Sequence, residues 1–324
     1  MKSRSLRVGA LAAAFLVAGA ACAAEAYPSR PIRLLVGFPP GGAVDVTARA
    51  VSTAVSERLR QQVVVDNRAG AHGNIAAETV ARASPDGYTL LMGTISILAI
   101  NPAIYKKVPY DSIRDFQPIT ILVSVSNVVV AHPAIGVSTM KELIELARTK
   151  PGALTYASSG LGSPGHLAAE LLKTLAKIDL LHVPYKGGGP AMVDLLAGQV
   201  NTMFATVPTA APHIRSGKLK ALAVTNARRT NALPTVPTMS EATGFSYEAD
   251  NWYGVVAPAG TPRLVVDRLN TEFRAALQIP AVRDRLAGQG LEPAPSTPEE
   301  FSAYLKREMV KWARVARDAG ARVD

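Results

Sequence analysis

Three glycine-rich turns, each placed between an apolar strand and a helix, constrain the fold of this chain more than any other feature. Elbow 1 covers residues 38–45 (FPPGGAVD), elbow 2 covers residues 68–73 (RAGAHG), and elbow 3 covers residues 158–163 (SSGLGS). Glycine lets the backbone approach a ligand closely, and the first N–H groups of a helix lack internal partners and attract anions. One such turn fits a plain strand-to-helix connection equally well. Three of them predict helix starts that converge on one negatively charged ligand.

Strands and helices are expected to alternate along the chain, and this alternation sets the fold class. The first block has strands over 32–38, 63–67 and 88–93, with helices over 44–61 and 74–83. Alternation of this kind predicts parallel sheets covered by helices on both faces. The second block continues the pattern with a strand over 125–131, helix 139–149, strand 154–158, helix 164–177, strand 179–184, helix 189–197, strand 200–205, helix 207–216 and strand 219–225.

The first block has too few strands for a full sheet, and the segment after residue 250 could complete it. The chain would then cross between two lobes twice, near 120–127 and near 248–254. Two crossings form a hinge with a cleft, and the elbows would lie at the carboxyl ends of the strands, where open α/β sheets bind ligands. The expected fold is therefore α/β with two lobes, lobe 1 comprising residues 25–124 and 251–324 and lobe 2 comprising residues 125–250.

Residues 1–24 have the layout of a cleaved secretory signal. Three cations in the first seven residues precede an apolar stretch over 8–21, and small residues follow. The apolar stretch is short for a membrane span. Cleavage after residue 23 or 24 would remove Cys22, the only cysteine. A lipid anchor on Cys22 is the alternative, but Gly19 stands where such a signal usually has a large aliphatic residue.

The charge balance favours small anionic ligands. The formal charge of +10 falls to +7 after cleavage, because three cations are lost and no acid precedes Glu25. A moderately basic exported protein suits anionic partners. Lysines and arginines are scattered without a dense basic run, which argues against nucleic acid. No two of the five histidines have metal-ligand spacing, so we expect neither a metal nor another cofactor.

Motifs for catalysis or nucleotide binding are weak. Residues 160–165 formally match the dinucleotide fingerprint, but the following strand ends without a carboxylate for a ribose. No phosphate loop and no nucleophile elbow are found. His166, in the first turn after elbow 3, could donate to a carboxylate or cap its helix, and Asp45 could cap its helix or orient a donor. Trp252 could line the cleft or pack the hinge.

A loop at residues 185–187 adds a hydroxyl and a cation to the same rim, through Tyr185 and Lys186. With these motifs in view, the chain resembles the Bug-type substrate-binding proteins of tripartite tricarboxylate transporters over nearly all of its mature length. The motifs that carry the resemblance are Tyr27–Ile32, elbow 1, Asn67-Arg68 with Gly70 and Gly73–Ile75, Ser84–Leu90, Gly162-Ser163 with His166-Leu167, His182–Gly187, Ser216–Leu219 and Ala257–Pro262.

The resemblance implies a periplasmic receptor of the Venus-flytrap type (type II) that captures a small carboxylate and delivers it to integral membrane permease subunits. By position, binding roles pass to Gly41, Gly42, Asp45, Ser158, Ser159, Gly160, Ser163 and His166. The full set expected to line the ligand adds Phe38, Pro39, Ala71, His72, Thr94, Tyr185, Lys186, Gly187, Ala205, Thr206 and Trp252.

Two departures from the family pattern bear on the ligand. Ala69 and His72 replace a proline and a glycine in elbow 2. Ala205 and Thr206 stand where an aspartate often follows the strand, and loss of that aspartate disfavours amino acids. The expected ligand is a mono- or dicarboxylate, aromatic acids included, bound by a monomer without catalysis. The alternatives are a ligand-reporting protein for a membrane sensor and an α/β enzyme that uses His166 or Asp45.

Overall fold

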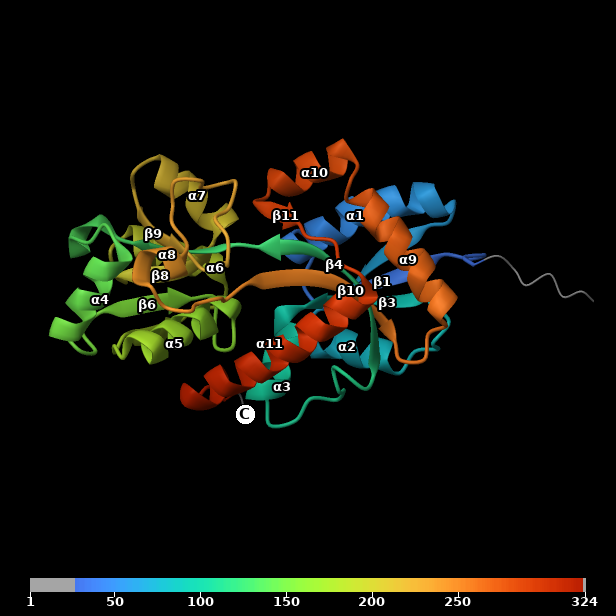
Figure 1. The fold of residues 1–324 in the computed structure, drawn as a ribbon, viewed down its shortest axis with the longest axis horizontal. Coiled ribbons are helices and arrows are strands. Elements are labelled where there is room, and N and C mark those ends of the chain that lie inside the picture. The colour runs from blue at the N-terminus through green and yellow to red at the C-terminus, as the bar shows by residue number, and fades with distance from the viewer. Residues whose placement is uncertain (1–26, 323–324) are drawn as a thin grey trace, which may run out of the picture.

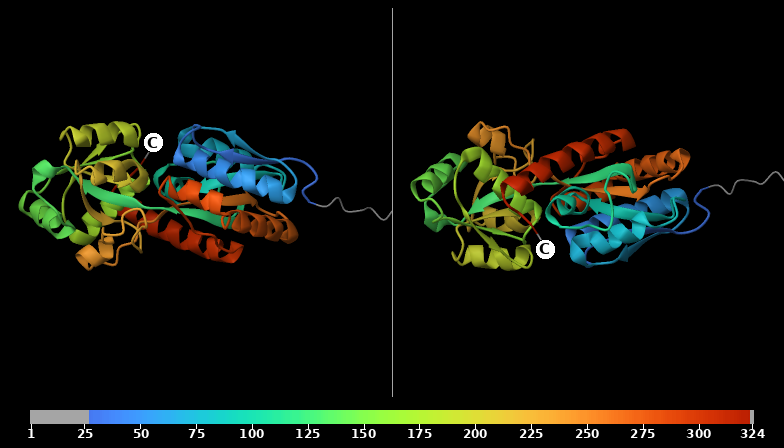
Figure 2. Two further views of the ribbon diagram at one scale, coloured as in Figure 1. Left: turned by 90° about the horizontal axis from the view of Figure 1, so that it is seen from above. Right: turned by 90° about the horizontal axis from the view of Figure 1, so that it is seen from below.

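A computed structural model describes residues 27–322 of the chain. The predicted signal at residues 1–24 and Cys22 lie outside the described residues. Two lobes, each with its own helix-covered sheet, lie end to end in every view (Figures 1 and 2). The two-lobed α/β fold expected from the sequence is therefore confirmed. No helix among residues 27–322 has the length and apolar character needed to cross a membrane.

The sheet of the first lobe has six strands in the order β11-β4-β10-β3-β1-β2. Its elements are β1 (Ile32–Val36), α1 (Ala43–Leu59), β2 (Val63–Asn67), the short turn η1 (Ala71–Gly73), α2 (Asn74–Ala81), β3 (Thr89–Thr94), the π-helical segment η2 (Ser96–Ile100), α3 (Asn101–Ile104), β4 (Phe116–Val125), β10 (Asn251–Pro258), α9 (Arg263–Ala276), α10 (Pro280–Ala287), β11 (Leu291–Pro293) and α11 (Pro298–Asp318).

The sheet of the second lobe has five strands in the order β7-β6-β8-β5-β9. Its elements are β5 (Asn127–Ala131), η3 (Pro133–Ile135), α4 (Met140–Thr149), β6 (Thr155–Ser158), α5 (Pro164–Ala176), β7 (Leu181–Pro184), α6 (Gly188–Leu196), β8 (Thr202–Thr206), α7 (Val207–Arg215), β9 (Lys220–Val224) and α8 (Met239–Thr243).

Both sheets are mixed, so the expectation of parallel sheets was wrong in part. Strand β10 runs antiparallel to β3 and β4, and β5 runs antiparallel to β8 and β9. The reason lies in the hinge. Strands β5 and β10 carry the chain from one lobe into the other, so each runs away from the shared face, whereas β1–β3 and β6 run toward it.

Two strands of the first sheet were absent from the sequence-based prediction. Strand β4 contains Pro118, which cannot donate to a sheet ladder and therefore argues against a central strand. The pairing of β4 with β10 is irregular here, since Pro118 pairs with Val256 beside a register shift, as expected for a β-bulge. Strand β11 has only three residues and no periodicity to read. The predicted strand 125–131 is interrupted at Ser126, between β4 and β5.

The two crossings between the lobes lie side by side. Strand β4 ends at Val125, which pairs with Asn251 at the start of β10. The Asn127 carbonyl accepts from the Thr225 N–H, and the Thr225 carbonyl accepts from the N–H of Ala249. Alongside the crossings, α11 extends from the first lobe to pack against α5 of the second (Figure 1). The crossings are thus fixed to each other by backbone hydrogen bonds.

Candidate functional site

The carboxyl ends of strands from both lobes meet at one interlobe face. Strands β1, β2 and β3 are parallel, and Thr94 at the end of β3 pairs with Tyr253 near the start of β10. In the other lobe, Thr206 at the end of β8 pairs with Asn127 just past the first crossing. Elbows 1 and 2 therefore lie on one side of this face and elbow 3 on the other. The sides touch, since a Cβ added to Gly162 would lie 2.1 Å from Ile104 Cδ1.

Elbow 1 is shaped by Asp45, which is 3% exposed. Its Oδ2 accepts from the Gly41 N–H at 3.0 Å, and its carboxylate also accepts from Arg49 Nε at 2.9 Å and Asn67 Nδ2 at 2.9 Å. Burial by itself would raise the pKa of Asp45, but the hydrogen bonds from Arg49, Gly41 and Asn67 outweigh it and lower that pKa. Because Arg49 balances its charge, the carboxylate can organise the turn without strongly repelling an anion.

Replacing Asp45 with asparagine should destabilise the first lobe. The amide loses the charge-assisted bonds, so we expect the free energy of unfolding to fall by about 2 kcal/mol at pH 7. A lowered pKa stabilises the fold above the ordinary carboxyl pKa and loses this effect as pH falls through the folded value. The difference in free energy of unfolding between wild type and Asp45→Asn, measured by urea unfolding, should therefore disappear in strong acid. An equal difference at pH 7 and pH 2 would contradict this.

Elbows 1 and 2 are in backbone contact. A Cβ added to Gly37, just before elbow 1, would lie 2.6 Å from the Cα of Gly73. The side chain of Asn101 stabilises elbow 2, because its Nδ2 donates to the His72 carbonyl at 3.1 Å and to Asn74 Oδ1 at 2.7 Å. The predicted ligand residues Ala71 and His72 are both exposed on this turn. Elbows 1 and 2 therefore form one continuous surface.

Elbow 3 is organised around the hydroxyl of Ser158, which is fully buried. Ser158 Oγ accepts from the Gly160 N–H at 3.2 Å and lies 2.7 Å from His182 Nε2. Ser163 caps α5 by accepting from the His166 N–H, and Gly187 N–H donates to the Ser159 carbonyl. The loop after β7 is thereby joined to elbow 3 through its backbone.

A stack of three rings lies behind elbow 3. His182 stacks between Tyr156, at 4.7 Å between ring centroids, and His166, at 4.2 Å. His166 Nδ1 accepts from the Gly162 N–H at 3.1 Å. Burial lowers the pKa of each histidine to about 4, with Lys173 adding to the effect on His166 and the neighbouring ring on His182. Both rings are therefore uncharged near neutral pH and rigidify the loop.

Several helices begin at the interlobe face with no side-chain cap. Gly42, Gly73 and Gly187 occupy the N-cap positions of α1, α2 and α6, and no side chain accepts from the first N–H groups. By contrast, α4 and α11 begin with complete capping boxes at Thr139 and Thr297. Uncapped N-termini have a positive dipole end and main-chain donors that suit a bound carboxylate. At α2 the first of these donors, the N–H of Asn74, already donates to the Ala71 carbonyl.

The other predicted site residues are divided between surface and interior. Phe38 is half-buried, and Pro39 and Lys186 are exposed. Thr94 and Ala205 are buried, and Trp252 lies beneath α11, 5.3 Å from the ring of Phe301. Further contacts are Tyr185 Oη to Asp194 Oδ2 at 2.7 Å, Thr206 Oγ1 to Thr209 Oγ1 at 2.9 Å, and Thr94 Oγ1 to the Ile97 N–H at 3.2 Å.

Three residues that contact the predicted ligand residues were not assigned a role in the site from the sequence. Asn67 and His182 appeared in the family motifs, yet only the fold brings them to Asp45 and Ser158. Tyr105, beside His72, carried no sequence signal, because it follows a four-residue helix far from elbow 2 in the chain. Within residues 27–322, no group of acidic, histidine or cysteine side chains could hold a metal ion.

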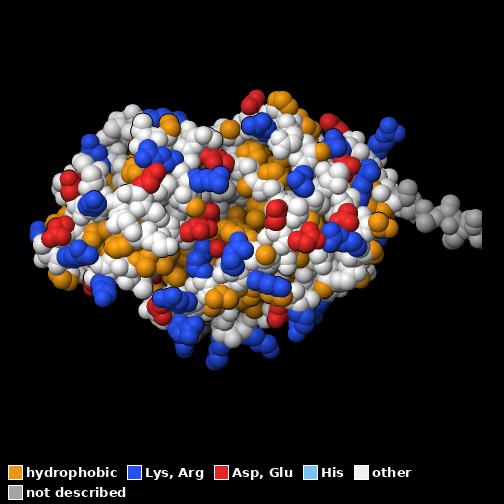
Figure 3. All heavy atoms as spheres, viewed as in Figure 1, with side chains coloured by type: hydrophobic (Ala, Val, Ile, Leu, Met, Phe, Trp, Pro, Cys, Tyr) orange, Lys and Arg blue, Asp and Glu red, His pale blue; other side chains and the backbone are white. Residues whose placement is uncertain are grey.

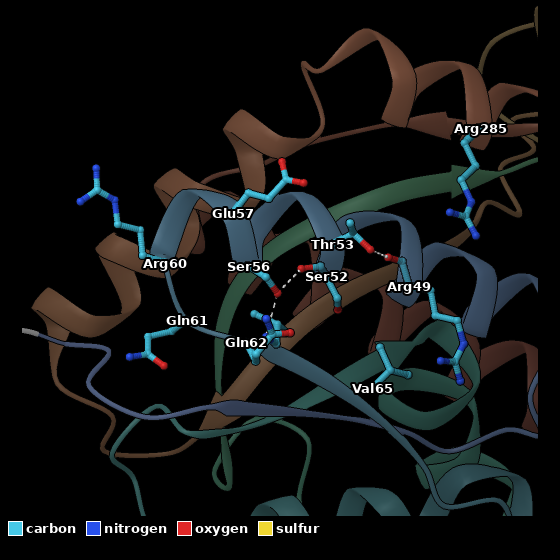
Figure 4. A pocket seen from close by; sticks show the side chains of 11 residues that line it. Arg49, Ser52, Thr53, Ser56, Glu57, Arg60, Gln61, Gln62, Val65 and Arg285 are labelled. Atoms are coloured by element: carbon cyan, nitrogen blue, oxygen red, sulfur yellow. Dashed lines mark hydrogen bonds between the residues drawn. The ribbon is translucent and has the colours of Figure 1, made fainter.

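A separate hollow of about 710 Å³ lies on the first lobe along α1 and the edge strand β2. Figure 4 shows Arg49 and Arg285 toward one end of it and Arg60 toward the other. One lobe alone supplies its lining, so lobe closure would not enclose a ligand there. Its link to the elbows is Arg49, which reaches Asp45.

A second groove, of about 600 Å³, does lie between the lobes. It contains residues of β11 and α10 from the first lobe and Arg215 and Asn231 from the second, and the surface is notched between the lobes in Figure 3. Glu292 bridges it, accepting from Thr230 Oγ1 at 2.7 Å and the Asn231 N–H at 2.9 Å.

Two α/β lobes, paired strand crossings and glycine-rich turns on the shared face define the class of two-lobed solute-binding proteins. The chain belongs to the tripartite tricarboxylate transporter family receptors, whose profile matches residues 47–321. Among its relatives is protein BugT of Bordetella pertussis, 39% identical over 303 residues, covering 93% of this chain and 92% of BugT. The resemblance to Bug-type proteins is therefore confirmed.

Solved structures agree with this assignment. R. palustris Rpa4515 with adipate is 38% identical with a TM-score of 0.80, covering 92% of this chain and all of that one. MatC from Rhodopseudomonas palustris with bound malate is 31% identical with a TM-score of 0.74, covering 89% and 99%. Each of these two structures contains a small carboxylate, adipate in one and malate in the other.

Proposed function

We propose that this protein is a periplasmic receptor that binds a small organic carboxylate between its lobes and delivers it to an integral membrane permease. The carrying observation is the set of uncapped, glycine-started helices α1, α2 and α6, contributed by both lobes to one face. Main-chain N–H groups at such helix starts hold an anion without a dedicated cation. The adipate and malate complexes of the structural neighbours support the same ligand class.

The lobes are proposed to move as units about the paired crossings. Residues 25–124 with 251–324 form one unit, and residues 125–250 form the other. The protein would act as a monomer in the periplasm after loss of residues 1–24. Closure would bring elbow 3 onto elbows 1 and 2, so that the ligand is enclosed by donors from both sides.

Reversible capture without chemistry fits the side chains at this face. Asp45 uses its carboxylate within elbow 1, and His166 and His182 are neutral and engaged inside elbow 3. Each of these groups already has a hydrogen-bond partner within its own elbow, which favours a structural role over that of a general base. Mass spectrometry after incubation with candidate acids should recover them unaltered, and turnover without added cofactor would support an enzyme instead.

A thermal-shift screen of mono-, di- and tricarboxylates tests the binding proposal. A ligand at one hundred times its dissociation constant adds about 2.7 kcal/mol of apparent stability, so a true ligand gives a clear rise in Tm. If no acid of the panel changes the Tm, carboxylate binding is contradicted. If only an uncharged solute raises the Tm, the proposal that helix starts hold an anion is contradicted.

Gly41→Val should abolish the shift produced by the best acid while the protein stays folded. Gly41 has φ +87°, and a Cβ there meets no atom within 4 Å, so the change strains elbow 1 without a clash in the unliganded protein. Gly136→Val is the matched control, because Gly136 has φ +74° and equally open surroundings at the end of η3. If both variants keep the shift, elbow 1 does not hold the ligand.

A further inference from the structure

Elbow 2 contains a run of four residues with positive φ angles. The φ angles are +141° at Gly70, +45° at Ala71, +52° at His72 and +92° at Gly73. Glycine adopts such angles freely, whereas a residue with a Cβ incurs strain. Strain of this kind at a non-glycine residue is concentrated at functional sites in proteins. His72 therefore occupies a position where its own side chain lowers the stability of the turn.

Packing inside the protein does not explain why residue 72 is a histidine. His72 is exposed, and Asn101 is bonded to its backbone carbonyl, which any residue would supply. The ring itself is hydrogen-bonded to Tyr105, with His72 Nδ1 2.5 Å from Tyr105 Oη. When the tyrosine hydroxyl donates to Nδ1, the neutral ring carries its proton on Nε2. The pair then presents an oriented N–H donor.

The pair stands where the two lobes touch. His72 adjoins Gly73, which is in backbone contact with Gly37 before elbow 1. Tyr105 directly follows Ile104, whose side chain meets Gly162 of elbow 3. His72 thus lies in elbow 2 next to its contact with elbow 1, and its partner Tyr105 follows the residue that meets elbow 3. The His72 side chain can therefore contact a polar group of the ligand that lies away from the carboxylate held by the main-chain donors of one helix start.

We propose that His72, positioned by Tyr105, is a specificity residue that contacts a second acidic group of the ligand. This inference rests on the proposed carboxylate-binding function and deepens it. Helix-start amides recognise one carboxylate with little selectivity for the rest of the molecule. A fixed N–H donor favours a ligand with an acceptor at the far end and leaves a monoacid without that contact.

The test compares wild type, His72→Gly and Lys177→Gly by titration calorimetry with acid pairs that differ by one carboxyl group: adipate with hexanoate, succinate with butyrate, and phthalate with benzoate. Lys177 is the matched control, because it also has φ +52° but ends α5. Relief of strain should raise the Tm of both glycine variants, by about 2 °C. Only His72→Gly should lower the affinity for the preferred diacid, by about tenfold. Its affinity for the matching monoacid should change by less than twofold.

Tyr105→Phe keeps the imidazole but removes its anchor, so it should lower the ratio of diacid to monoacid affinity partway toward the His72→Gly value. If His72 has a purely structural role, His72→Gly should have a lower Tm or should lose affinity for the diacid and the monoacid equally. Either result overturns the inference, while the proposed function stands. A wild-type protein that binds none of the acids overturns the proposed function itself.

Discussion

Gly37→Ala is expected to reduce carboxylate affinity by more than about 100-fold, because a displacement near 1 Å at a binding turn has effects of this size. Its Cβ would lie 2.6 Å from the Cα and 3.2 Å from the carbonyl oxygen of Gly73. Both clashing atoms belong to the backbone, so no rotamer change relieves them. Elbows 1 and 2 must separate, and the first lobe should lose about 2 kcal/mol of stability from overpacking.

Gly288→Ala is the matched control for this change. Gly288 ends α10 away from the elbows, has φ −59°, and an added Cβ would lie no nearer than 3.3 Å to another atom. Calorimetric titration and thermal unfolding of both variants separate the two effects. Wild-type affinity in a folded Gly37→Ala protein would show that the contact between elbows 1 and 2 is irrelevant to binding.

The second large effect concerns the hinge. Among the described residues, four buried polar atoms without a hydrogen-bond partner lie at or beside the crossings: Asn127 Nδ2, Asn226 Oδ1, Asp250 Oδ1 and Trp252 Nε1. Burial, and then the nearby negative charge of Glu248, raise the pKa of Asp250 from 3.8 to about 7. Glu308 adds to this effect and Lys311 opposes it. An ionised Asp250 is therefore destabilising where the lobes join.

The sign of the pH dependence follows from proton binding. Between about pH 4 and pH 7 the folded protein keeps a proton on Asp250 that the unfolded chain has released, so stability falls as pH rises through this window. The difference between the ordinary pKa of 3.8 and the folded pKa of about 7 corresponds to about 4 kcal/mol. We expect about half of this, because Asp250 retains some solvent contact.

Asp250→Asn should therefore be about 2 kcal/mol more stable than wild type at pH 8 and nearly equal to it at pH 4. Urea unfolding followed by tryptophan fluorescence provides the measurement, since Trp252 and Trp312 are the two tryptophans of the chain and both pack near this cluster. Glu308, whose pKa burial also raises, leaves some residual pH dependence in the variant. A destabilised Asp250→Asn protein at pH 8 would contradict the assignment.

Local sequence predicted the elbows well, because glycine clusters and strand ends are properties of neighbouring residues. Elbow 3 illustrates this: Ser163 caps α5 with proline next to it, as the spacing indicated. The strand β4 escaped prediction because Pro118 is tolerated only through irregular pairing with β10, a segment more than 130 residues later. The ligand contacts themselves stay predictions.

The amino-acid sequence by itself determined where strands give way to helices and which helix starts have a side-chain cap, such as Ser163 at α5, since capping and φ preferences act within a few residues. The tertiary structure alone decided which side chains support each turn. Asn67 reaches Asp45 only because the parallel strands β1 and β2 end at the same edge of the sheet, and Tyr105 reaches His72 only because η1 packs beside η2, the segment that leads into α3. Contacts between distant segments depend on that packing, and no short-range pattern encodes them.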